Sequence, residues 1–355
     1  MLEHPEETLD SHGQFSRERY SRYVQSCVAR AEAMSAAPGV ACREHRVLCL
    51  VDLQGIYLAL TRWLRERDFP LENGLVVSRL AVLLLKSVIQ QIEDDVMSSE
   101  AEGAITFERL VDLIYSKKLT GSRQFESVTK IEPSIELFYA PAPLKDIAWQ
   151  LRKEERKGSH EARRQLRDLE RGILSVHQTP RDYSVYDDFI KSLMRDPLVS
   201  RSEQGFFNFY VGARGLQSFD EKEVDIRIAV RAVDACHASE CDALCVVSSD
   251  QDFMPLHERC ERAGLRSFQA DVTRLSGGWP GRRLKNLGAG FIAAGTKPEW
   301  PLRIIIEASR PVGLYDLSAR ELEALCRIHN GMNEVQLGLV PQPDGTMGFK
   351  VFRPL

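Results

Sequence analysis

The sequence predicts an α/β fold in which a parallel sheet carries helices on both faces. Short continuous apolar runs, such as those at residues 46–52 and 242–247, are typical of strands buried on both faces of a parallel sheet. These runs alternate with segments whose apolar residues recur at helical spacing, as in successive strand–helix units. With 355 residues and 43% hydrophobic content, the chain can form one large core, or one core and a small second domain.

Each element follows from its local pattern. Strands are expected where apolar or aromatic runs end in turn residues, and helices where apolar residues recur at i, i+3 and i+4. The expected strands of the sheet are residues 46–52, 134–140, 205–212, 242–250 and 265–271. The expected helices are residues 56–67, 77–96, 106–119, two within 143–175, and 185–196, 222–238 and 252–264.

The order of these elements suggests three parts. Residues 1–44 form a partly helical N-terminal extension, and residues 45–297 form the main domain. The segment from about residue 60 to 200 is longer than a crossover between two strands needs, so we expect a helical insertion there. This insertion could bind a second copy of the chain or a protein partner. Residues 298–355 predict a small α+β unit, with a strand at 302–308, a helix at 318–330 and a hairpin turning at 343–346.

Composition excludes several classes of protein. The net charge of −4 excludes a uniformly basic nucleic-acid coat and permits a local basic groove. The eight cysteines form no CxxC pair, which favours a reducing compartment over a disulfide framework. The N-terminus lacks a signal-peptide pattern, and the longest apolar run is short and contains Lys86. We therefore expect a soluble cytoplasmic protein that does not contact a membrane.

Carboxylates gather at one edge of the predicted sheet. Asp52 ends the first strand, and Asp250 and Asp252 follow the fourth. The carboxyl ends of parallel strands form the usual site in such sheets. Asp225, near the start of a helix, is a further candidate. Helix capping by Asp250 and a favourable helix dipole at Asp225 explain each residue singly, but the set predicts an oxygen-rich site for Mg²⁺ or Mn²⁺.

Three segments resemble the motif series of the NYN domain, a branch of the PIN-like metal-dependent nucleases. They are VLCLVDLQGIY at residues 47–57, KEVDIRIAVRAVDA at 222–235 and DALCVVSSDQDFMPLHERCERAGLRS at 242–267. The third is the most specific. The resemblance covers residues 45–60 and 205–295, and it implies a PIN-like three-layer sandwich for the main domain.

The resemblance also implies a function, a Mg²⁺- or Mn²⁺-dependent endoribonuclease. By this likeness Asp52, Asp225, Asp250 and Asp252 would be both the metal ligands and the catalytic residues. The chain departs from the family pattern at three positions: Gly55 replaces an Asn, Arg231 stands where an acid is common, and Ala289 stands where an Asp is usual. A catalytically degenerate module that binds RNA or a protein partner therefore stays open, as does another Mg²⁺-dependent phosphoryl-transfer enzyme.

Substrate contacts are expected from polar and basic residues around these acids. Phosphate contacts hold a nucleic acid in register, and an exposed aromatic ring can stack on an unpaired base. The glycine-rich loop GGWPGRRLK, with three cations and Trp279, follows the fifth strand. The candidate substrate-binding residues are Gln54, Ser248, Ser249, Arg231, Arg282, Arg283 and Lys285. The sequence leaves RNA and single-stranded DNA equally open as substrates.

Overall fold

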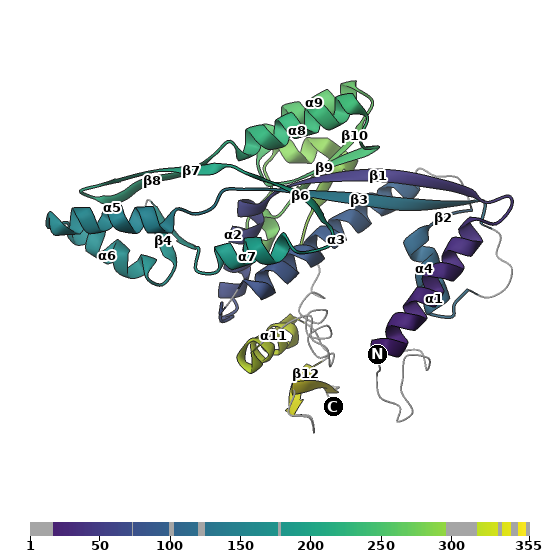
Figure 1. The fold of residues 1–355 in the computed structure, drawn as a ribbon, viewed down its shortest axis with the longest axis horizontal. Helices are drawn as coiled ribbons and strands as arrows, with labels where there is room; N and C mark the ends of the chain where they lie inside the picture. Colours follow the sequence, from purple (N-terminus) through teal and green to yellow (C-terminus); the bar gives the residue numbers. More distant parts are fainter. Residues whose placement is uncertain are drawn as a thin grey trace.

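The structure is a computed structural model of the chain. It describes residues 17–72, 74–98, 103–119, 125–176, 179–295, 318–332, 336–341 and 347–352. Figure 1 shows a central sheet with helices on both faces, an arm that projects from one end and a second, smaller extension at the other. The three-layer α/β architecture predicted from the sequence is confirmed.

Seven parallel strands form the central sheet. Their order is β11-β10-β9-β1-β3-β2, and β6 pairs with the carboxyl-terminal half of β3. The strands are β1 (Ala41–Asp52), β2 (Ala104–Thr106), β3 (Ser127–Tyr139), β6 (Val199–Gln204), β9 (Ala243–Val247), β10 (Arg266–Asp271) and β11 (Phe291–Ala293). The predicted strands in β1, β3, β9 and β10 are all present, although β1 and β3 begin earlier than expected.

Helices cover both faces of this sheet (Figure 1). One face carries α8 (Val224–Ala238) and α9 (Met254–Arg262). The other carries α2 (Leu53–Arg65), α3 (Leu75–Ser98) and α7 (Tyr186–Leu193). Short 3₁₀ helices complete the connections: η2 (Gln251–Phe253), η3 (Thr273–Ser276) and η4 (Arg283–Gly290). The chain between β9 and α9 and the chain after β10 thus leave the sheet at the same edge.

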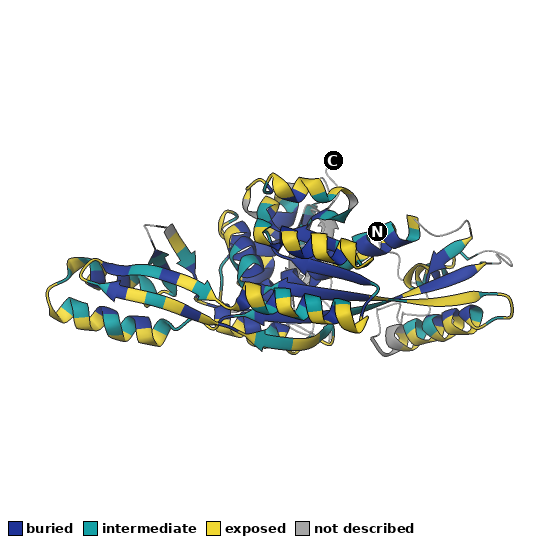
Figure 2. Ribbon diagram, turned by 90° about the horizontal axis from the view of Figure 1, so that it is seen from above, coloured by how far each residue is buried: buried dark blue, intermediate teal, exposed yellow. Residues whose placement is uncertain are grey.

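The main core lies along β1 and β9. All five residues of β9 are buried, as are Val47–Val51 of β1, because helices pack on both faces of these strands. Figure 2 shows the same concentration of buried residues in the central sheet. Helix α3 is long and apolar enough, by length and composition, to cross a membrane, but 61% of its most apolar window is buried within the protein. Its apolar side chains are therefore accounted for by the core.

A second, smaller core supports the extension at the amino end of β1 and β3. It joins α1 (Arg17–Ser35), α4 (Phe107–Tyr115) and β2 around side chains such as Cys27, Leu110 and Val128. The N-terminal helix therefore packs on residues from the predicted insertion.

The arm at the other end corrects the prediction for residues 205–212. They form β7 (Phe206–Gly212), which pairs in an antiparallel hairpin with β8 (Gly215–Lys222) and lies outside the parallel sheet. Gly215, at φ +76°, closes the turn. Strand β8 escaped prediction because its outward residues are polar. The remaining arm elements are α5 (Leu144–Arg156), α6 (His160–Leu169), β4 (Ile173–Val176) and β5 (Thr179–Asp182).

The C-terminal unit contains α11 (Ala319–Met332) and an antiparallel hairpin of β12 (Gln336–Pro341) and β13 (Met347–Phe352). The Asn330 amide fastens helix to hairpin, since it donates to the Leu337 carbonyl at 2.8 Å and accepts from the Leu337 amide at 2.7 Å. Leu325 and Cys326 join the main core. The predicted strand at 302–308 lies outside the described residues.

Candidate active site

Asp52 is the last residue of β1 and caps α2. Its Oδ1 accepts a hydrogen bond from the Gly55 amide, and its Oδ2 accepts one from the Ser248 hydroxyl, both at 3.2 Å. Ser248 follows β9, whose Val247 lies opposite Val51, so the two strand ends meet at the carboxyl edge of the sheet. A Cβ added to Gly55 would lie 3.0 Å from Asp52 Oδ2, so any side chain at position 55 would begin beside this carboxylate.

The Asp250–Asp252 turn is positioned by one buried glutamine. Asp250 accepts a hydrogen bond from the Asp252 amide at 2.8 Å and thereby caps η2. The Gln269 side chain donates to the carbonyls of Ser248 at 2.9 Å and Asp250 at 2.6 Å. Because its nitrogen is used in this way, its oxygen accepts from His257 Nε2, 2.9 Å away. The backbone of the turn is fixed, and both aspartates stay exposed at the edge.

Glu221, at the end of β8, lies with Asp52, Asp225, Asp250 and Asp252 at what we call the acidic edge. This residue was not predicted from the sequence. It is half-buried, and its Oε1 is buried without a hydrogen-bond partner. Burial and the nearby carboxylates of Asp52 and Asp225 raise its pKa to about 8. A signal was present, because Glu221 lies four residues before Asp225 in the acidic run DEKEVD. Residue 221 was overlooked because β8 was not predicted as a strand.

The carboxylates influence one another electrostatically. Burial, followed by the charge of Asp225, raises the pKa of Asp52 to about 6 against its hydrogen bonds. Although Asp225 as a whole residue is exposed, desolvation of its carboxyl group raises its pKa, as do the charges of Asp250 and Asp252. The charged neighbours behind these shifts are all carboxylates. The edge is therefore a region of concentrated negative charge, which a cation would stabilise.

The donor chemistry of this edge fits a hard divalent cation. Carboxylate oxygens are the ligands that Mg²⁺ and Mn²⁺ prefer, and the unpartnered oxygen of Glu221 is available to bind. Within the described residues, however, no three His, Cys, Asp or Glu side chains gather closely enough to hold an ion. Asp225, Asp250 and Asp252 are exposed. Their side chains would have to rotate toward Asp52 for a complete ligand set.

Three predicted substrate-binding residues are engaged within the fold. Gln54 donates from Nε2 to the Tyr183 hydroxyl at 2.9 Å, so its amide points toward the arm. The Ser249 hydroxyl accepts from the Val272 amide at 3.1 Å and ties the end of β10 to the turn. The Ser248 hydroxyl is the donor to Asp52 described above. Each supports the site, and their contact with substrate stays a prediction.

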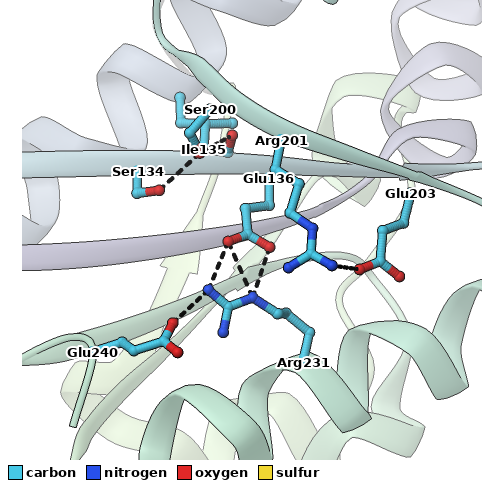
Figure 3. A network of polar contacts seen from close by, with 8 residues as sticks. All are labelled: Ser134, Ile135, Glu136, Ser200, Arg201, Glu203, Arg231 and Glu240. Carbon is cyan, nitrogen blue, oxygen red and sulfur yellow. Dashed lines mark hydrogen bonds and ion pairs between the residues drawn. The ribbon is translucent and has the colours of Figure 1, made fainter. Parts of the chain in front are cut away.

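Arg231, a further predicted substrate-binding residue, is paired with carboxylates of the fold, and its contact with substrate stays a prediction. Its guanidinium binds both carboxylate oxygens of Glu136 at 2.8–3.1 Å and Glu240 at 2.7 Å (Figure 3). Glu136 lies in β3 opposite Leu50, two residues before the level of Asp52. The side chain of Arg231 is 14% exposed. It therefore neutralises a buried glutamate about 7 Å below the edge.

The predicted basic loop reaches the Asp250–Asp252 turn through Gln251, the residue between the two aspartates. The Arg283 backbone amide donates to Gln251 Oε1 at 3.1 Å. Gly281 also lies against this side chain, because an added Cβ would come within 2.1 Å of its Cδ. The side chains of Arg282, Arg283 and Lys285 are exposed. The structure thus brings the loop and the aspartates together, although they are separated in sequence.

Comparison with known protein families identifies one domain in the chain. The NYN domain model matches residues 162–269, which contain Glu221, Asp225 and the Asp250–Asp252 turn. This region is therefore a NYN domain. The NYN domains are a PIN-like nuclease family, whose members typically use a divalent metal. Asp52 lies outside the match and joins the site through the pairing of β1 with β9. No curated protein and no solved structure matches the chain.

Proposed function

We propose that this NYN-domain chain is a metal-dependent endoribonuclease that hydrolyses RNA at the acidic edge. One observation carries the proposal: carboxylates from four separate elements lie near enough at the carboxyl edge of the sheet to contribute to the raised pKa values of Asp52, Glu221 and Asp225. An arrangement this unfavourable for folding is common where a site needs its charge.

Mg²⁺ or Mn²⁺, when bound, would activate a water and stabilise the charge that develops on the phosphodiester. Asp52 is a pre-positioned ligand, because its two oxygens are held by the Gly55 amide and the Ser248 hydroxyl. Glu221 would complete the buried side of the ligand set with its unpartnered oxygen. Asp225, Asp250 and Asp252 form the solvent side, where exposed carboxylates can adjust as substrate arrives.

A degenerate module that binds RNA without cutting it is the second candidate. Gly55 favours it, because the family's Asn at this position would place an amide beside Asp52, and glycine has no side chain to do so. Gln54 does not replace this amide, since it is bonded to Tyr183. The incomplete gathering of the carboxylates in the described residues points the same way.

Cleavage of labelled RNA by the purified chain separates the two candidates. The reactions contain Mn²⁺, Mg²⁺ or EDTA, and the variants are Asp250→Asn and the control Asp234→Asn. Asp234 is an exposed carboxylate on α8, away from the acidic edge. The nuclease proposal expects metal-dependent cutting that Asp250→Asn loses and Asp234→Asn keeps. RNA binding without cutting in any metal would favour the degenerate module.

A further inference from the structure

The loop that follows β10 has an unusual charge distribution. Residues 272–295 contain four cations and no carboxylate, whereas the whole chain is acidic with a net charge of −4. The cations are Arg274, Arg282, Arg283 and Lys285, and all four are exposed. Within the described residues, Arg282, Arg283 and Lys285 form no ion pair, whereas many arginines elsewhere in the fold do. A local attraction for phosphate therefore adjoins the acidic edge.

An aromatic side chain stands out from the same loop. Trp279 is 82% exposed, more than any other large apolar side chain of the described residues. Its neighbours hold the loop in place, since Pro280 and Leu284 are buried and Leu275 is 4% exposed. The ring is thus presented to solvent by an anchored segment, in contrast to a loop tryptophan that packs on its own surface.

The loop is also fastened to the reacting end of the site. Gln251, between Asp250 and Asp252, accepts a hydrogen bond from the Arg283 backbone amide. Its side chain also occupies the space that a side chain at position 281 would need. A side chain at position 281 would displace Gln251, so the contact requires glycine there. The position of the loop is therefore set relative to the two aspartates.

We propose that this loop, residues 277–285, selects an unpaired RNA strand, with Trp279 stacked on one base and Arg282 and Arg283 on its phosphates. Stacking on an aromatic side chain needs an exposed base face, which a duplex hides within its own stack. The cations attract any nucleic acid, so the tryptophan supplies the preference for a single strand. The inference deepens the proposed function, since it takes RNA as substrate from it.

Binding without cleavage tests the inference independently of catalysis. Fluorescence anisotropy in EDTA compares a labelled unstructured 12-nucleotide RNA, the same RNA in a duplex, and single-stranded DNA of the same sequence. The variants are Trp279→Ala, Trp279→Phe and the control Trp149→Ala, which removes another exposed tryptophan, 64% exposed on α5. Thermal melting verifies that each variant is folded.

Trp279→Ala should weaken binding of the unpaired RNA by roughly 5- to 100-fold and leave the duplex unchanged. Trp279→Phe should retain most of the affinity, and Trp149→Ala all of it. The double change Arg282→Ala/Arg283→Ala should weaken the binding of both the single strand and the duplex. It should also reduce the slope of log affinity against log salt concentration for the single strand by about 1.4. Unchanged binding by Trp279→Ala, or an equal loss for duplex and single strand, would overturn the inference. Equal binding of single-stranded DNA by the wild-type chain would overturn the choice of RNA.

These outcomes are separable from the fate of the proposed function. If the wild-type chain binds single-stranded RNA through Trp279 but never cuts it with Mn²⁺, the inference stands and the nuclease proposal fails. If it cuts RNA and Trp279→Ala changes neither the affinity nor the KM, the nuclease stands and the inference fails.

Discussion

Replacing Glu221 with glutamine should make the stability of the metal-free protein less dependent on pH. The pKa of Glu221 is raised from an ordinary 4.5 to about 8 in the folded chain. Between these values the folded state binds more protons than the unfolded state. Stability therefore decreases as the pH rises through this window. Glutamine cannot ionise, so the variant should lack this part of the decrease.

The magnitude follows from the same pKa values. The rise in the pKa of Glu221 from 4.5 to about 8 lowers the free energy of unfolding at alkaline pH by about 5 kcal/mol. The rise in the pKa of Asp52 to about 6 lowers it by about a further 3 kcal/mol between pH 4 and 6. Glu221→Gln should match the wild type near pH 5 and exceed it by several kcal/mol at pH 8.5. Urea unfolding in EDTA, followed by circular dichroism at pH 5, 7 and 8.5, measures the difference.

Added metal should narrow the difference in stability between the two proteins. Mn²⁺ stabilises the folded state in proportion to its affinity, and Glu221→Gln removes one ligand and one negative charge. At pH 8.5 the wild type should therefore gain more stability from 1 mM Mn²⁺ than the variant. Asp220→Asn, an exposed neighbour on the same strand, is the control. A variant no more stable than the wild type at pH 8.5 in EDTA would refute the electrostatic reasoning.

Three further predictions concern the supports of the site. Arg231→Met should lower the free energy of unfolding in urea by about 3–5 kcal/mol, because it leaves Glu136 buried and unpaired. Adding Glu136→Leu to that variant should restore most of the lost stability. Gln269→Leu should cost about 2–4 kcal/mol by the same measurement and slow cleavage, since two backbone carbonyls of the turn lose their donor. Gly55→Asn should raise the cleavage rate at limiting Mn²⁺ by supplying an amide beside Asp52, while lowering the melting temperature, because the new Cβ crowds that carboxylate.

Hydrophobic patterning explains how much of the fold was predictable. β1, β9 and β10 are buried between helix layers, so their apolar runs identify them in any context. β6 (VSRSEQ) and β8 (GLQSFDEK) lie at an edge or in an arm and are largely polar, so no run marks them. Their pairing is fixed by the strands beside them, which a single sequence does not reveal.

The site was predictable to the same extent. Asp52 and Asp250 follow recognisable strands, and the parallel topology brings their strand ends together. Glu221 follows an unpredicted strand and was therefore missed. The partners of Arg231 come from β3 and from the chain after α8, so its spacing from Asp225 does not reveal them. Charge pairing of this kind depends on tertiary contacts rather than on local pattern.

Separate surfaces for attraction and for chemistry resolve an electrostatic conflict in the proposed enzyme. The acidic edge repels phosphates until a cation neutralises it, because the charged neighbours of Asp52, Glu221 and Asp225 are carboxylates. The loop at residues 277–285 attracts phosphates whether or not metal is present. Since Gln251 joins the loop to the Asp250–Asp252 turn, a strand held by the loop already lies next to the edge. RNA affinity should therefore depend mainly on the loop, and turnover on the carboxylates.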